Sequence, residues 1–168
     1  AFACRRGWEE LLEKVAWTGD SKAGIIGLLY NPNITVAQAP TGDWTTASAQ
    51  EMYDDLVFAK TTVFNVTNGN ERINRLVIAS QKYSIVDTTI MFDDRTVLSV
   101  FLKNNPEITV DYLTALDQVM PRPSAIGGAS DCMLGYNYDQ EYIALEIPRD
   151  FKQESPQAEN LAYKVNTH

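Results

Sequence analysis

Side chains that could carry out catalysis are few in this sequence and lie far apart. The only histidine is the last residue, His168, so a Ser-His-Asp or Cys-His arrangement would depend on a terminal side chain. Two pairs of carboxylates, Asp54-Asp55 and Asp93-Asp94, could in principle bind magnesium or share a proton. Neighbouring residues on a helix point about 100° apart, so Asp54 and Asp55 cannot both face one ion. We interpret this pair as solvated helix surface.

The remaining candidates have structural interpretations too. Asp93 and Asp94 precede Thr96 and form a polar lead-in to a helix that an Asp or the Thr caps. Cys132 lies in an apolar stretch, where cysteine behaves as a small hydrophobic residue. The stretch 24–32 is rich in glycine but lacks the Gly-Lys-Ser/Thr of a phosphate-binding loop. The sequence therefore predicts no catalytic residue, no cofactor and no metal site.

Composition limits the class of protein. A chain of 168 residues with 45% hydrophobic content can bury a core, as one domain or as two lobes. The formal charge of −8 argues against a surface that neutralises nucleic-acid phosphates. Cys4 and Cys132 are the only cysteines, which favours reduced thiols over a disulfide scaffold. No stretch approaches the ~18 apolar residues of a membrane span, and no signal peptide precedes the first predicted helix, so we expect a soluble, intracellular product.

The elements that must position these residues are clearest between Ser48 and Tyr112. Ser48 and Glu51 have the spacing of a capping box, so a helix is expected to begin near Ser48. One face of this helix carries apolar residues at helical spacing, namely Met52, Leu56, Ala59 and Val63. We expect the helix to end in a left-handed cap at Asn68-Gly69.

A strand, two short helices and a second strand are expected next. The stretch from Arg75 to Ser80 is almost continuously apolar, as a strand covered on both faces requires. The elements predicted after it are a helix capped by Ser80 and carrying Tyr83, Val86 and Ile90, a helix from Thr96 to Asn104, and a strand from Ile108 to Tyr112.

The flanking segments contain further elements. Trp8, Leu11, Leu12 and Val15 have the spacing of one helical face, and residues 41–46 form a polar connector. Two prolines and two glycines in residues 121–130 predict an exposed loop. Alternating apolar residues predict strands within 132–136, 142–147 and 161–167.

Several of these motifs occur in an order that resembles one family. They are Trp8-Glu-Glu-Leu-Leu, Gly24-Ile-Ile-Gly-Leu-Leu-Tyr-Asn-Pro, the capped helix, Leu76-Val-Ile-Ala-Ser, Thr96-Val-Leu-Ser-Val-Phe-Leu-Lys-Asn-Asn-Pro and Leu145-Glu-Ile-Pro. Together they are similar to major capsid proteins of tailed bacteriophages and prophages with the Hong Kong 97-type fold. The resemblance implies an α+β chain.

The same resemblance implies how the chain is divided. Residues 1–41 would contain the end of the spine helix of the peripheral domain and the loop after it. Residues 42–130 would form the axial domain, and residues 131–168 would return to the peripheral sheet. Compared with the family, the chain is expected to lack the N-terminal arm, the extended loop before the spine helix and the last peripheral strand.

As a function, the resemblance implies a major capsid subunit that self-assembles into an icosahedral shell around phage DNA. Such a subunit would be made in the host bacterial cytoplasm and reside in the virion. Its partners would be copies of itself in hexamers and pentamers, with scaffolding or portal proteins possible, DNA held without sequence-specific contact, and no membrane. The candidate subunit-interface residues are Pro121, Arg122, Pro123, Gly127, Gly128, Trp8 and Tyr163.

Two alternatives belong to other classes. Encapsulin-type nanocompartments share the fold, so a cellular shell protein with an internal cargo-docking pocket is the first alternative. A small-molecule enzyme is the second, and a closed pocket lined by Asp93, Asp94 and Cys132 would favour it.

Overall fold

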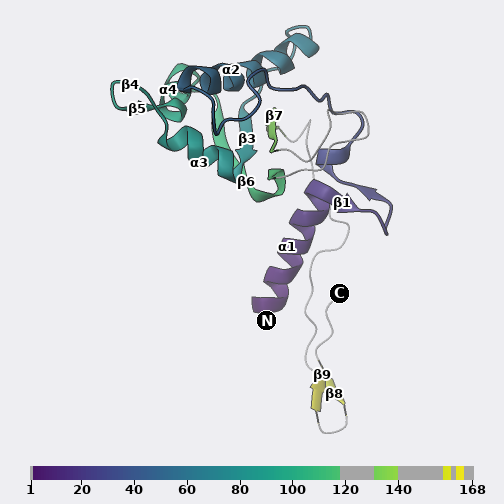
Figure 1. The fold of residues 1–168 in the computed structure, drawn as a ribbon. Coiled ribbons are helices and arrows are strands. Elements are labelled where there is room, and N and C mark those ends of the chain that lie inside the picture. The colour runs from purple at the N-terminus through teal and green to yellow at the C-terminus, as the bar shows by residue number, and fades with distance from the viewer. Residues whose placement is uncertain (1, 118–130, 140–156, 160–161, 165–168) are drawn as a thin grey trace. The chain divides into compact units, whose positions relative to one another are not determined.

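A computed structural model describes residues 2–117, 131–139, 157–159 and 162–164 (Figure 1). The chain divides into two compact units, one that combines residues 1–32 with 144–168 and one that comprises residues 33–143. The sequence placed boundaries at 41/42 and 130/131 instead. The assignment of peripheral and axial domains stays a prediction.

The first unit contains a long helix and short hairpins. Its elements are α1 (Phe2–Thr18), β1 (Gly19–Asp20), β2 (Ile25–Ile26), the 3-10 helix η1 (Leu28–Tyr30), β8 (Gln157–Glu159) and β9 (Ala162–Lys164). The expected helix around Trp8 is thus confirmed. The expected C-terminal strand is present as β9, which pairs antiparallel with β8.

The β1–β2 hairpin depends on a close approach of two glycines. A Cβ at Gly19 would lie 2.3 Å from the carbonyl oxygen of Ile25, and one at Gly27 would lie 2.3 Å from the amide nitrogen of Gly19. Gly19 also has a φ of +80°, which only glycine adopts without cost. The hairpin leaves Ile25 and Ile26 exposed.

A three-stranded sheet organises the second unit. β3 (Arg75–Ala79) lies in the centre, parallel to β6 (Thr109–Leu113) and antiparallel to β7 (Met133–Tyr136). Four of the five residues of β3 are buried, which confirms the expected two-sided burial. The strand that the sequence predicts within residues 132–136 is present as β7, and it gives β3 a hydrogen-bond partner along its second edge.

The helix α2 (Ala49–Val66) begins and ends as the sequence predicts. The Ser48 side chain accepts a hydrogen bond from the Glu51 amide, and the Glu51 carboxylate accepts one from the Ser48 amide. At the other end Asn68 has a φ of +52° and Gly69 one of +82°. The amide of Gly69 donates to the carbonyl of Phe64 over 2.8 Å, which closes a Schellman-type cap.

The segment between β3 and β6 differs from the prediction in two places. It contains α3 (Ser80–Thr88), the hairpin β4 (Ile90–Phe92) and β5 (Arg95–Thr96), and α4 (Val97–Asn104), and η2 (Thr114–Leu116) follows β6. Thr96 caps α4 as expected. Ser80 does not cap α3, because it is the first helical residue and its hydroxyl donates to the Asp117 carboxylate instead. Ile90 lies beyond α3, in β4, and is exposed.

The core of the second unit lies between α2, α4 and one face of the sheet. Met52 and Leu56 of the predicted stripe are buried there, while Ala59 and Val63 are partly buried at its margin. Their partners include Leu76 and Ile78 of β3, Val86 of α3, and Val97, Leu98 and Phe101 of α4. The stripe therefore faces the strand that the sequence predicts, and is buried most deeply in its first half.

Because Leu56 is fully buried, Leu56→Ala should lower the free energy of unfolding by about 2–5 kcal/mol. Urea denaturation of the purified chain measures this change. Val66→Ala, on an exposed residue of the same helix, should change it by less than about 0.5 kcal/mol. A Leu56→Ala cost below ~1 kcal/mol would contradict the assigned core position.

Candidate functional site

A buried carboxylate, Asp55 of α2, is the main polar feature of the second unit. Its oxygens accept hydrogen bonds from the Trp44 indole Nε1 over 2.7 Å and from the Thr41 hydroxyl over 3.0 Å. The Thr41 amide also donates to it over 3.3 Å. The interpretation of Asp54-Asp55 as solvated surface is thus wrong for Asp55, which is fully buried, while Asp54 is exposed. Donors on the preceding loop compensate for the lost hydration of the carboxylate.

The loop of residues 41–46 is consequently not a free connector. Trp44 is buried, and Asp43 forms an ion pair with Lys82 of α3 at 2.9 Å. Lys82 also lies 3.5 Å from Asp131, which precedes β7. One ammonium group therefore links the loop, α3 and the start of β7. The sequence signal that could have revealed this was Trp44 itself, because a buried indole N–H requires an acceptor.

The ion pair of Asp43 and Lys82 lowers the pKa of the carboxyl group and raises the pKa of the ammonium group, so it favours the charged form of both. The hydrogen bond from Lys82 is the largest cause that holds the pKa of Asp43 below its ordinary value of 3.8, and Thr45 adds to it. Burial lowers the pKa of Lys82, but the hydrogen bonds and charges of Asp43 and Asp131 outweigh it, so the Lys82 pKa is raised.

A pocket next to this cluster contains the candidate cysteine. It is lined by Ala39, Gly42, Trp44, Ile78, Lys82, Asp131, Cys132 and Met133. Neither Asp93 nor Asp94 lines it, so the set that would have favoured a small-molecule enzyme is not brought together. Among the described residues, no group of three or more His, Cys, Asp or Glu side chains could hold a metal ion.

Asp93 and Asp94 form the turn of the β4–β5 hairpin. Their φ angles are +50° and +57°, the left-handed pair that a tight two-residue hairpin turn requires. They lead into α4 as expected, but Thr96 alone supplies the cap. Both residues are exposed at the tip of the hairpin.

The structure describes only two of the predicted interface residues, Trp8 and Tyr163. Trp8 is half-buried on α1, beside Leu11, whose side chain is 51% exposed. Tyr163 lies in β9 opposite Ala158. Pro121, Arg122, Pro123, Gly127 and Gly128 lie outside the described residues, as does the expected strand 142–147. In the part of the chain that the structure describes, no helix has the length and apolar character to cross a membrane.

The fold of the chain is similar to that of a phage capsid protein. The model is similar to a chain from a structure titled "The capsid of Myoviridae Phage XM1", with a TM-score of 0.82 and 16% sequence identity. The match covers 98% of this chain and 56% of the phage chain, so this chain spans little more than half of the phage protein's length. No curated protein matches the sequence.

A family model described as "Major capsid protein" matches residues 1–168, and the chain therefore belongs to the major capsid protein family. Membership over the whole chain and the structural likeness confirm the resemblance and the α+β capsid fold that the sequence predicts.

Because Asp55 accepts three hydrogen bonds in a buried position, Asp55→Ala should lower the free energy of unfolding by about 2–4 kcal/mol, since it leaves buried donors without an acceptor. Asp54→Ala is the matched control on the adjacent, exposed residue and should cost less than about 0.5 kcal/mol. Chemical denaturation followed by tryptophan fluorescence measures both. Equal effects of the two substitutions would contradict the role of Asp55.

The depressed pKa of Asp43 predicts a dependence of stability on acid. A carboxyl group whose pKa is lower in the folded chain stabilises it fully above the unfolded pKa, and this contribution is lost as the pH falls through the folded pKa. Wild type should therefore be more stable than Asp43→Asn at pH 6, and the difference should shrink as the pH falls below the ordinary value of 3.8. Thermal melts at several pH values test this. A constant difference down to pH 2 would refute it.

Proposed function

We propose that this chain is part of a major capsid subunit that assembles with copies of itself into an icosahedral shell of hexamers and pentamers. The shell would enclose phage DNA, and the mature location of the chain would be the virion. The observation that carries the proposal is the match of the major capsid protein family to residues 1–168. The chain would be synthesised in the cytoplasm of a host bacterium.

The domain division belongs to the same proposal. Residues 42–130 would form the axial domain, and residues 1–41 and 131–168 the peripheral domain. The loop with Pro121, Arg122, Pro123, Gly127 and Gly128 would lie at the axial contacts between subunits, and Trp8 and Tyr163 at peripheral contacts. Residues 121–130 contain two prolines and two glycines, residue types that are typical of loops.

The negative net charge of the chain supports the proposal that the shell encloses DNA without binding it tightly. With 22 acidic and 14 basic residues, the chain cannot gain affinity by neutralising many phosphates. A shell subunit of this kind would enclose DNA without sequence-specific contact. Scaffolding and portal proteins are further proposed partners during assembly.

The two alternatives are less well supported. An encapsulin-type cellular shell is disfavoured because the similar structure comes from a phage capsid. An enzyme is disfavoured because the described pocket at Cys132 places a single lysine between two aspartates, where its charge is used in ion pairs.

Expression of the complete protein that contains this chain should yield closed, uniform shells in negative-stain electron microscopy. Contacts between subunits would be repeated by symmetry, so the particles should have one or a few discrete diameters. Leu56→Ala, which weakens the core of a subunit, should reduce the yield of shells. Persistent monomers or irregular aggregates from the wild-type protein would contradict the proposal.

We also expect the chain to have no hydrolase, transferase or nuclease activity. The physical reason is that the candidate groups Asp93 and Cys132 are not brought into one pocket. Turnover assays on generic ester, phosphoester and DNA substrates test this. Activity that disappears in Asp93→Ala or Cys132→Ser would overturn the expectation.

A further inference from the structure

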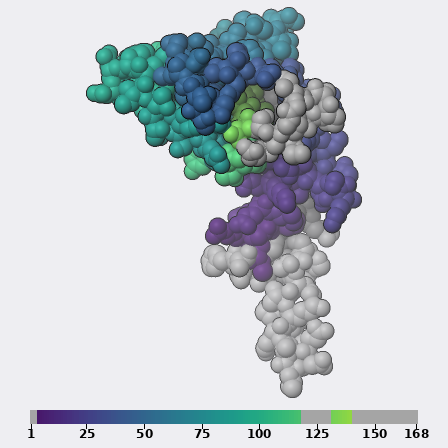
Figure 2. Space-filling model, in the orientation of Figure 1, coloured from purple at the N-terminus to yellow at the C-terminus, as the bar shows by residue number. Residues whose placement is uncertain are grey.

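The β4–β5 hairpin presents apolar side chains to solvent in a fixed geometry. Met91 packs against the core, at a point where the register of β4 against β5 shifts between Ile90 and Phe92. These two side chains are 61% and 48% exposed. The Val97 amide donates to the Thr89 carbonyl over 3.0 Å and holds the base of the hairpin closed. Figure 2 shows this hairpin as a projection on the outer surface of the second unit.

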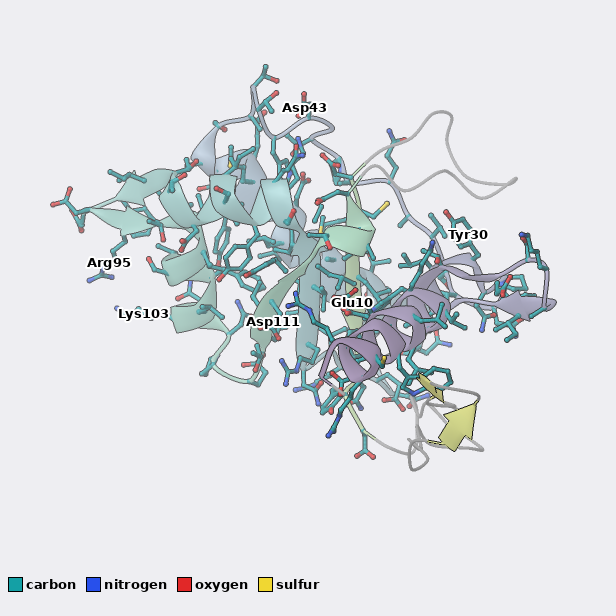
Figure 3. All side chains as sticks on the ribbon, turned by 90° about the horizontal axis from the view of Figure 1, so that it is seen from below. Glu10, Tyr30, Asp43, Arg95, Lys103 and Asp111 are labelled. Carbon is teal, nitrogen blue, oxygen red and sulfur yellow. The ribbon has the colours of Figure 1, made fainter. Side chains whose placement is uncertain are left out.

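The tip of the same hairpin is acidic. No described residue forms a hydrogen bond or ion pair with the carboxylates of Asp93 or Asp94. Arg95 stands opposite Phe92 in the hairpin and points outward (Figure 3). With two carboxylates and one guanidinium, the tip has a net charge of −1. We call Ile90, Phe92, Asp93 and Asp94 the hairpin patch.

A second apolar surface lies at the C-terminal end of α2. Phe64 and Val66 are 41% and 53% exposed. A Cβ on Gly69 would lie 3.2 Å from the Phe64 ring, so the helix cap lies directly against that ring. The Arg72 guanidinium lies 5.8 Å from the ring centroid, and within the described residues it forms no ion pair. We call Phe64, Val66 and Arg72 the helix-end patch.

The two patches lie at opposite ends of the second unit. In Figure 1 the hairpin projects at one end, and the C-terminus of α2 lies at the other. An 18-residue helix is about 27 Å long, so a single copy cannot bring its own patches together. Two copies can, if they are arranged head to tail.

We propose that the hairpin patch of one copy docks on the helix-end patch of a second copy of this chain. Ile90 and Phe92 cover Phe64 and Val66, and the Asp93-Asp94 carboxylates face the Arg72 guanidinium. Each patch has an apolar centre and a charge of the opposite sign at its edge, which is the arrangement of specific interfaces. Because the two patches lie on a hydrogen-bonded hairpin and at the end of a helix, we expect docking to cost little conformational entropy.

The proposal rests on the proposed function in that it requires self-association, and it adds the direction of the contact. A contact between two different patches is heterologous, so a bound pair still offers one free hairpin patch and one free helix-end patch. Such a contact leads to closed rings or open chains of subunits. A contact between two hairpin patches, with Arg95 of each copy facing the carboxylates of the other, would instead stop at a pair.

Cysteine cross-linking distinguishes these arrangements. In a Cys4→Ser, Cys132→Ser background, Phe64→Cys with Phe92→Cys in one chain should give a ladder beyond the dimer with a short bis-maleimide reagent. A mixture of the two single variants should give dimers only, and each single variant alone should give none. Dimers from Phe92→Cys alone would overturn the proposal in favour of a pair of hairpins.

Charge reversal provides a test that keeps the apolar side chains in place. Arg72→Glu should weaken self-association about tenfold in sedimentation velocity, because it places like charges at the contact. Asp93→Arg with Asp94→Arg should do the same, and all three substitutions together should restore most of the loss. Lys103→Glu, on an exposed residue of α4 outside both patches, is the control and should leave association unchanged. Absence of restoration, or a wild-type chain that stays monomeric, would overturn the contact.

Cross-linking inside particles separates this inference from the proposed function. Intact shells in electron micrographs without a Phe64→Cys to Phe92→Cys cross-link would refute the contact and leave the capsid proposal standing. Cross-linked ladders from a protein that never forms closed shells would support the contact and refute the capsid proposal.

Discussion

The buried carboxylate of Asp55 is the constraint on which the second unit depends. A polar group that is buried in a protein must be compensated by hydrogen bonds. Here the donors come from a loop that precedes α2, so the loop has to lie against the helix for the helix to be buried. Lys82 then fixes the same loop to α3 and to the residue before β7. Asp55 and Lys82 together thus specify the relative positions of four segments that hydrophobic burial alone would position less uniquely.

The three-stranded sheet provides the apolar surface on which the core of this unit is built. β3 is hydrogen-bonded to a neighbouring strand on each edge and is buried on both faces. It therefore fixes the register of β6 and β7, and its apolar side chains pack in one core with those of α2 and α4. Gly135 of β7 leaves space on this face for Ile73 and Leu76, which lie in contact with the position of a Cβ at 3.3 and 3.8 Å. The result is a unit whose interior is one cluster of buried hydrophobic side chains and whose outer elements are turns, hairpins and helix ends.

That division suits a protein whose function resides in its surface. In the described residues the polar side chains that do gather, around Asp55 and Lys82, are engaged in hydrogen bonds and ion pairs with one another. The exposed apolar residues instead occupy well-defined positions, in the β4–β5 hairpin and at the end of α2. Rigid exposed side chains lose little entropy on contact, whereas the same residues on a mobile segment would contribute less to association. Membership of the major capsid protein family is consistent with this use of the surface.

The sequence by itself determined the features that depend on near neighbours in the chain. The capping box of Ser48 and Glu51, the Asn68-Gly69 cap and the Thr96 cap each join residues within one or two helical turns, and the apolar run of β3 is a local pattern. Motif order also identified the family. Tertiary structure alone decided that Asp55 is buried while Asp54 is exposed, that Ser80 binds Asp117, and that β7 pairs with β3. The partners in those cases are between 11 residues apart, for Trp44 and Asp55, and 61 residues apart, for Arg75 and Tyr136. Such contacts depend on how elements pack, which periodicity and capping signals do not specify.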